Sequence, residues 1–182
     1  MNRFLIDYHP EAIARQLCDQ HITKMPLEEA QMLSHALHRH MGNEEETFAD
    51  FNKRMGLQNG PKIHAKHPCT IWAGDTRANY RFALNLLEEM CIEKTLRFGK
   101  PHKCQQLIPK FLELEHKIPD GRLTAHPQCF SGHDDLKIDD PWPVQSYRQF
   151  YIVDKLRFAR YNKCRSMPDW LGEYSVKTVQ NI

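Results

Sequence analysis

The stretch "DTRANYRFALNLLEEMCIEKTLRFG", residues 75–99, is the clearest helical pattern in the chain. Asp75 suits an N-cap, and Gly99 suits the left-handed position that follows a helix. Between them, apolar side chains recur every three or four residues, which places them on one side of a helix. These are Tyr80, Ala83, Leu84, Leu87, Met90 and Cys91. The pattern predicts a long amphipathic helix that helps to build a helical core.

The flanking sequence indicates further helices on both sides. We expect a helix over about 10–18, a second that ends at about 41, and a third at 43–55. Further helices are expected at 104–116, with an interruption near Pro109, and at 143–164. Pro26 is awkward inside a helix, so the second helix either begins near Thr23 or kinks. The opening residues suit a short strand or an extended arm. Residues 118–143 are irregular. Together these elements predict a mostly α protein. We expect a single domain over 1–182 with a long irregular segment before its last helix.

Composition and length are those of an ordinary globular domain. The chain has 182 residues, of which 41% are apolar and 26% charged, and this excludes disordered and collagen-like proteins. It has no run of eighteen apolar residues and no secretory signal, so we expect a cytoplasmic protein without a membrane partner. Its six cysteines form no C-x-x-C pair, so we expect small buried thiols rather than disulfides.

Positive charge is sorted along the chain, although the net charge is only +2. Residues 94–110 and 155–165 each carry lysines and arginines without any acid, whereas acids gather at 43–50 and 134–140. Such sorting can focus an electric field on an anionic ligand. The alternative is that both basic stretches are solvated helix ends.

A polar stripe runs through "CDQHITKMPLEEAQML", residues 18–33, and just beyond it. Steps of three and four residues place its members along one side of a helix. The members are His21, Lys24, Glu28, Gln31 and His35. The stripe is either the solvated side of an ordinary helix or the floor of an active site. Glu29 points elsewhere and is expected to face solvent.

Three stretches together resemble a family of small conserved proteins of tailed bacteriophages. They are "CDQHITKMPLEEAQ", then "HPCTIWAGDTRANY" with "RFGKPHK", and finally "YRQFY" on the last helix. The resemblance covers most of the chain. It implies a phage protein that acts in the cytoplasm of the host cell, and it implies no mechanism.

A shorter stretch is similar to the phage pyrimidine-dimer DNA glycosylases, which are all-α DNA-repair enzymes. Their early Asp-Gln-His sequence matches residues 19–21, and their catalytic glutamate, seven residues after that histidine, matches Glu28. Those enzymes attack the sugar with the amine of an N-terminal threonine. Here Asn2 follows Met1, and a side chain of that size prevents removal of the methionine. The nucleophile is therefore missing, or another amine takes its place.

The stripe contains the groups that an N-glycosidase needs. A carboxylate such as Glu28 can stabilise the oxocarbenium-like centre or activate water. His21 or His35 can help the departing base to leave. Lys24 can form a Schiff base if it is desolvated, or only an ion pair with Glu28. Gln31 can bond a base edge or face water.

Two groups of residues suggest contacts with phosphate. A helix start offers free N–H groups, and a glycine turn among basic side chains is reachable by a phosphate. The candidates are Arg77, Asn79 and Tyr80 at the helix start and Arg97, Lys100, His102 and Lys103 around the turn, with Tyr147 and Arg148 on the last helix. The alternative for Asn79, Tyr80 and Tyr147 is capping and core packing. Trp72 is expected in the core.

No metal and no cofactor are predicted. Two histidine groups, one at 35, 38 and 40 and one at 64 and 67, lack a known ligand spacing with acidic partners. The leading functional hypothesis is an enzyme that cleaves or exchanges an N-glycosidic bond in DNA or nucleotides. The alternatives are a phage protein that binds and inhibits a host factor, and a nucleic-acid-binding module without catalysis.

Overall fold

The structure is a computed structural model that describes residues 3–43, 45–57 and 65–172. Every regular element within these residues is helical, which confirms the predicted mostly α fold. The α-helices are α1 (Pro10–Gln16), α2 (Asp19–Met41), α3 (Phe48–Met55), α4 (Pro68–Asp75), α5 (Arg77–Phe98), α6 (Ile108–Leu114) and α7 (Val144–Phe150). None of the described helices is long and apolar enough to cross a membrane.

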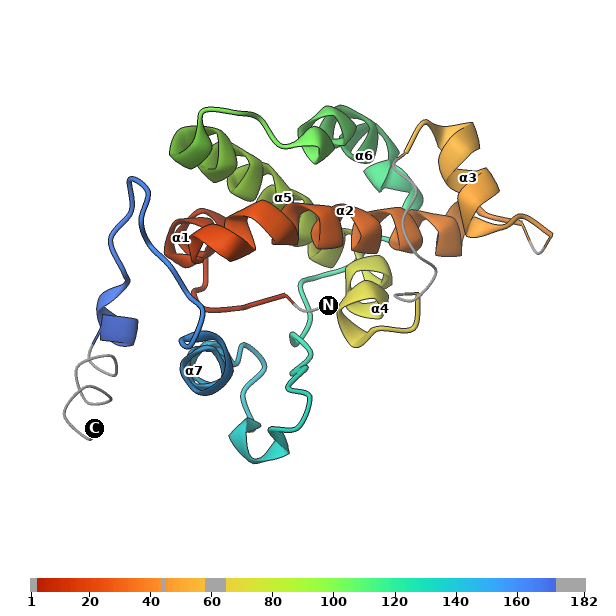
Figure 1. The fold of residues 1–182 in the computed structure, drawn as a ribbon. Coiled ribbons are helices and arrows are strands. Elements are labelled where there is room, and N and C mark those ends of the chain that lie inside the picture. Colours follow the sequence, from red (N-terminus) through yellow and green to blue (C-terminus); the bar gives the residue numbers. More distant parts are fainter. Residues whose placement is uncertain (1–2, 44, 58–64, 173–182) are drawn as a thin grey trace.

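Helices α2 and α5 form the centre of the fold. They pack against each other, α1 packs on α5, and α4 packs on both (Figure 1). The predicted helix over 75–99 is α5, and Gly99 follows it with a φ of 67°. Its N-cap is Thr76, whose hydroxyl accepts the Asn79 N–H at 3.1 Å. Asp75 instead ends the preceding helix and pairs with Arg39 at 2.8 Å.

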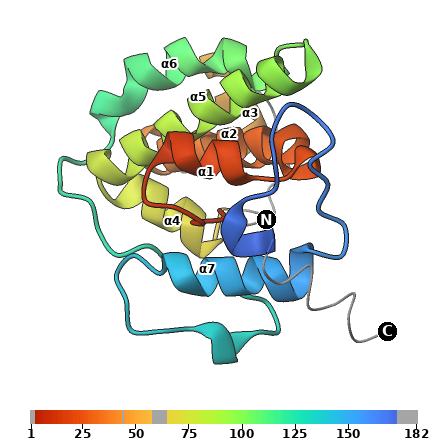
Figure 2. The ribbon, with the colours of Figure 1, turned by 90° about the vertical axis from the view of Figure 1, so that its left-hand side faces the viewer.

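Helix α2 starts at Asp19, so Pro26 lies in its interior. Of the two predicted alternatives, the start near Thr23 is therefore wrong. Residues 3–9, the described part of the chain before α1, form no strand; they are an extended arm whose Phe4, Leu5 and Ile6 are buried. Both ribbon views place this arm between the α1–α2 layer and α7 (Figures 1 and 2). The arm therefore links the α1–α2 layer to α7.

The last helix is shorter than the predicted 143–164. Helix α7 ends at Phe150 and continues as a π-helical turn, Tyr151–Lys155, in which the Leu156 N–H donates to the Tyr151 carbonyl at 3.0 Å. Beyond it, Gln20 of α2 donates to the Phe158 carbonyl at 2.8 Å and accepts the Arg160 N–H at 3.1 Å. Hydrogen bonds to the Gln20 side chain of α2 thus take the place of the backbone bonds that would continue the last helix. A π-turn of this kind often marks a functional site.

Residues 118–143 are irregular, as predicted, apart from a single 3₁₀ turn at Asp134–Leu136. This segment leaves the α6 end of the molecule, runs down beside α4 and then loops round to α7 (Figure 1). Hydrogen bonds from helical side chains fix it at several points. It supplies one wall of the cleft described next.

Candidate functional site

A cleft of about 400 Å³ lies between α2 and the π-helical turn. Helix α2 contributes His21, Lys24 and Glu28 to its lining. Residues from distant parts of the chain complete it: Phe4 from the arm, Cys129 and Ser131 from the irregular segment, and Phe150, Asp154, Lys155 and Phe158 near the π-turn. Three members of the polar stripe therefore share one concave surface.

Glu28 supplies the carboxylate of the cleft. Its side chain is only 10% exposed, and its Oε1 lies 2.9 Å from Lys24 Nζ. The Lys24 side chain is 69% exposed. A lysine that forms a Schiff base needs a desolvated amine, and an amine in water does not meet that condition. The geometry of Lys24 is that of an ion-pair partner that holds the carboxylate in place.

His21 is the second reactive group of the cleft. Its Nδ1 lies 2.7 Å from the Tyr151 hydroxyl, and its ring stacks on Phe4 with centroids 4.5 Å apart. Burial, helped by the charges of Lys155 and Lys24, lowers the pKa of His21 to about 3. The imidazole is therefore neutral near pH 7. It can donate one hydrogen bond, but it cannot act as a charged acid.

The Tyr151 hydroxyl positions the His21 ring. Tyr151 Oη accepts the Cys18 N–H at 3.0 Å and lies 2.7 Å from His21 Nδ1. A hydroxyl oxygen can accept two hydrogen bonds and its proton can also be donated, so this contact fits both tautomers of His21. The contact fixes the orientation of the imidazole in the cleft.

The cleft also contains a lysine that the sequence analysis did not select. Lys155 Nζ lies 2.5 Å from an Asp154 carboxylate oxygen, and it lies over the Phe4 and Phe150 rings at 5.7 and 5.0 Å. The acid-free stretch at 155–165 pointed to this region, but helical periodicity could not reveal the π-turn. Phe4 and Phe158 were missed because they join the site only through tertiary packing.

The far end of the polar stripe does not reach the cleft. His35 stacks on Phe48 of α3 with ring centroids 3.5 Å apart, so its predicted catalytic role is wrong. Gln31 is buried and is not among the residues that line the cleft. Because α3 packs on this part of α2, the part of the stripe that lines the cleft ends at Glu28.

Glu29 contradicts the expectation that it faces solvent. It is buried and accepts two hydrogen bonds of 3.1 Å from Arg3 Nε, one at each carboxylate oxygen. The guanidinium also lies over the Trp72 ring at 4.9 Å. Trp72 is in the core, as predicted. This ion pair joins the N-terminal arm to the inner face of α2.

The predicted phosphate site between the two ends of α5 cannot exist. A helix of 22 residues is about 33 Å long, so its first turn and the segment after Gly99 are far apart. Arg97 is also unavailable, because its guanidinium is fully buried and donates to Glu93 and to carbonyls at the end of α1. The predicted phosphate contact of Arg97 is wrong; the residue closes the C-terminal end of α1.

The candidates at the start of α5 hold the irregular segment. Asn79 is buried and donates to the Trp72 carbonyl at 2.9 Å and to the Thr124 hydroxyl at 2.8 Å. Tyr80 is buried with its hydroxyl 3.4 Å from the Phe111 carbonyl. Arg77 lies 3.7 Å from the Asp120 carboxylate. For Asn79 and Tyr80, the capping and packing alternative is the correct one.

Two candidates on α7 are also structural. The buried Tyr147 donates to the Pro127 carbonyl at 2.7 Å. Arg148 Nε donates to the Ile6 carbonyl at 2.9 Å, and its guanidinium reaches Asp7 at 3.4 Å. Both side chains tie α7 to neighbouring segments. The predicted phosphate contact of the buried Tyr147 is therefore wrong, whereas that of Arg148, whose side chain is 22% exposed, stays a prediction.

Part of the predicted basic turn does lie beside the cleft. His102 and Lys103 line a shallow groove of about 310 Å³ together with Lys94 and Lys24. Lys24 belongs to both the groove and the cleft. Lys100 is exposed nearby in sequence but is not among the groove's lining residues. The groove therefore extends the cleft with positively charged side chains.

Three of the five histidines weighed as metal ligands, His35, His38 and His40, are engaged elsewhere. His38 packs edge-on against Phe51, and His40 Nε2 lies 2.7 Å from the Gly74 carbonyl oxygen. His64 lies outside the described residues, as does Met1. His67, in contrast, lies with Cys69 and Cys129, whose potential ligand atoms are all within 4.8 Å of one another.

The six cysteines are not joined in disulfides. Four of the six are buried, as predicted, whereas Cys129 is half-buried and Cys164 is exposed.

No protein-family model, no curated protein and no solved structure matches the chain. The proposal for its function therefore rests on the geometry of its own residues.

Proposed function

We propose that the cleft hydrolyses an N-glycosidic bond in DNA or in a nucleotide, as a phage-type enzyme would. One observation carries this proposal: Glu28 and His21, a carboxylate and a neutral imidazole, line the same cleft with aromatic rings beside them. A cleft of about 400 Å³ is within the usual range for small-molecule sites. The resemblance of residues 19–28 to the DNA glycosylases supports the same chemistry.

Glu28 is the catalytic carboxylate in this mechanism. As the base departs, positive charge grows at the anomeric carbon, and a carboxylate next to that carbon stabilises it. The same carboxylate can accept a proton from the attacking water. Its ion pair with Lys24 fixes its orientation without removing it from the cleft.

His21 assists the leaving base. In the tautomer that carries its proton on Nε2, the ring donates to a nitrogen or carbonyl oxygen of the base while negative charge accumulates there. A neutral imidazole with a depressed pKa is suited to this role, because it stabilises the charge without being protonated first. The Phe4 and Phe158 rings beside His21 offer surfaces on which a base can stack.

Water, rather than an amine, is the nucleophile that this geometry favours. Lys24 remains largely in solvent, so the desolvation that activates a lysine is missing. The enzyme we propose therefore releases the base without a covalent intermediate at Lys24. Borohydride should trap no adduct at this residue.

The basic groove favours DNA over a free nucleotide. Lys94 and Lys103 extend from the cleft through the shared Lys24, and phosphates on either side of a flipped nucleotide need such contacts. A free nucleotide would occupy the cleft alone. Binding to DNA should accordingly weaken as salt is raised.

The test is a survey of base release. Undamaged duplex DNA, ultraviolet-irradiated duplex DNA and the four deoxynucleoside monophosphates are incubated with the full chain, and free bases and abasic sites are quantified. Glu28→Gln should lower release by about 100-fold or more. Glu113→Gln is the control, because Glu113 is 63% exposed and outside the cleft. If the wild-type chain releases no base from any substrate, the proposal fails.

Such a failure would leave the two other classes of function. A protein that inhibits a host factor would bind a host protein with no change in any nucleic acid. A nucleic-acid-binding module would bind DNA in a salt-dependent way without product. Binding measurements on the same DNA samples distinguish these two outcomes.

A further inference from the structure

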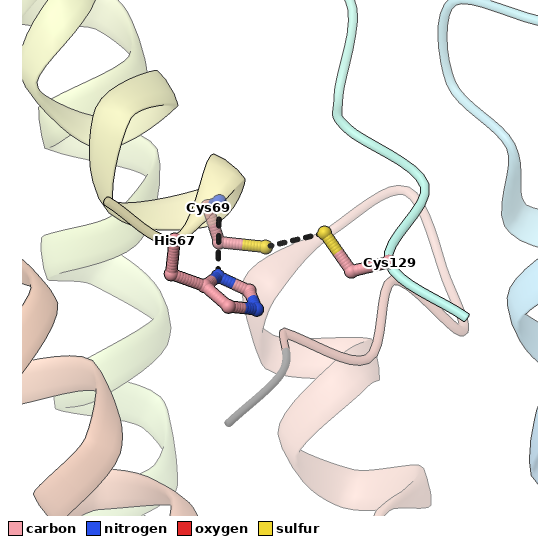
Figure 3. A group of neighbouring side chains, drawn as sticks. All are labelled: His67, Cys69 and Cys129. Atoms are coloured by element: carbon pink, nitrogen blue, oxygen red, sulfur yellow. Dashed lines mark hydrogen bonds between the residues drawn. The ribbon is translucent and has the colours of Figure 1, made fainter. Parts of the chain in front are cut away.

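We infer that His67, Cys69 and Cys129 form a zinc-binding site. Figure 3 shows the three side chains converging from the start of α4 and from the irregular segment. Their potential ligand atoms lie within 4.8 Å of one another. The inference does not depend on the proposed glycosidase activity, because it concerns a different set of residues.

The distance between the two sulfur atoms fits a shared metal ion. Cys69 Sγ and Cys129 Sγ are 3.7 Å apart. Two thiolates bound to one tetrahedral zinc at about 2.3 Å each are separated by about 3.8 Å. A disulfide requires about 2.05 Å, so it would need the two chain segments to move together. A metal could bind both sulfurs almost without such movement.

His67 already presents an unprotonated nitrogen at this position. Its Nδ1 accepts the Cys69 N–H at 3.2 Å and so caps α4. A nitrogen that accepts a hydrogen bond is unprotonated, and it carries the lone pair that a metal requires. Binding through Nδ1 would exchange this cap for a metal bond at the same end of the helix. The two thiols would each release a proton on binding.

Hydrogen bonds hold the segment that carries Cys129. The Cys129 N–H lies 3.4 Å from Tyr147 Oη, and that hydroxyl donates to Pro127 at 2.7 Å. The Gln128 side chain forms two bonds with the Ile138 backbone, of 2.6 and 3.1 Å. Cys129 and the two residues before it are thus fixed, and a site of this kind needs little ordering to bind its ion.

The ligand set selects the metal and leaves one coordination position open. Two thiolates and an imidazole favour zinc over magnesium or calcium, which prefer oxygen ligands. Three protein ligands leave the fourth tetrahedral position to solvent or to a bound molecule. His67 and Cys129 line a surface groove of about 460 Å³, and Cys129 also lines the cleft that contains Glu28. A ligand of the ion can therefore enter from solvent.

Cobalt(II) is the probe for this site, because its bonds to thiolates absorb light. The reduced full chain, kept in a phosphine reductant that supplies no competing thiol, is titrated with cobalt. We expect one equivalent to bind with a sulfur-to-cobalt charge-transfer band, and zinc to displace it. Cys69→Ser and Cys129→Ser should each abolish the band. Cys164→Ser is the matched control, because Cys164 is exposed and outside the cluster.

A further variant separates metal binding from helix capping at His67. Asparagine is a good N-cap residue but a poor zinc ligand. His67→Asn should therefore keep the thermal stability of the metal-free chain and weaken cobalt binding by about tenfold or more. Circular dichroism confirms that each variant folds. Absence of the band in the wild-type chain, or an unchanged titration in both cysteine variants, would overturn the inference. A negative base-release survey would leave this result untouched.

Discussion

Glu28 and Glu29 are identical neighbours on α2 with opposite surroundings. Glu28 lines the cleft, and its partner Lys24 is 69% exposed. The Glu29 side chain is 2% exposed, and its partner Arg3 is fully buried. A helix turns by about 100° per residue, so adjacent side chains face different parts of the molecule. The surroundings, rather than the residue type, determine that one carboxylate can meet a substrate and the other holds the fold.

The two ion pairs should therefore differ in energy. A buried charge that loses its partner keeps its desolvation cost, whereas an exposed charge regains water. Arg3 is buried beneath α2, so removing its partner Glu29 should strongly lower the free energy of unfolding. Removing the Lys24–Glu28 pair should lower it much less, because Lys24 is largely in water.

The largest expected effect is that of removing Glu29. Glu29→Ala leaves Arg3 buried without its carboxylate and should lower the free energy of unfolding by about 3–5 kcal/mol. Glu28→Ala should lower it by less than about 1 kcal/mol. Urea unfolding measures both values. Equal losses in the two variants would contradict the division of α2 into a structural face and a cleft face.

Acid should reveal the burial of His21. Its pKa in the fold, about 3, lies below the ordinary value of 6.5, so the unfolded chain takes up the proton first. The contribution of His21 to the free energy of unfolding is fully present above about pH 6.5. It falls as the pH is lowered towards 3, by up to about 1.4 kcal/mol per pH unit. His21→Gln should remove that part of the slope. The control is His126, another buried histidine with a depressed pKa, whose contribution remains in the variant. Parallel stability curves for both chains would show that His21 is solvated.

The smallest expected effect is that of Lys24→Ala on stability. Lys24 is 69% exposed and regains water when it loses Glu28, four residues on, so the contact contributes less than about 0.5 kcal/mol from its side. The variant should melt within about 2 °C of the wild-type chain, as estimated from the size of the domain. A loss comparable to that of Glu29→Ala would mean that Lys24 supports the fold.

Local pattern predicted much of the fold. The apolar repeat of α5 and its closing Gly99 are local features, and so is the irregular segment before α7. The end of α7 was not predictable in this way, because Gln20 withdraws the backbone of 158–160 from the helix through contacts more than a hundred residues apart in sequence. The boundary at Thr76 was missed because Asp75 is an equally good cap by residue type.

The site was predictable only where one helix supplies it. His21, Lys24 and Glu28 were found from their spacing on α2. Phe4 and Lys155 come from opposite ends of the chain, and no local pattern joins them. Arg97 was misassigned because a basic residue in an acid-free stretch gives no sign that it is buried beneath the end of α1. Cys69 and Cys129 are 60 residues apart, so no short metal-ligand motif could reveal them.

The central claim is that Glu28 acts on charge that develops only as the glycosidic bond breaks. The most direct measurement compares single-turnover base release and DNA affinity in Glu28→Gln and in the wild-type chain. We predict a rate lowered by about 100-fold or more with a dissociation constant changed less than about threefold. A rate that is unchanged, or a rate loss fully explained by weaker binding, would contradict the account.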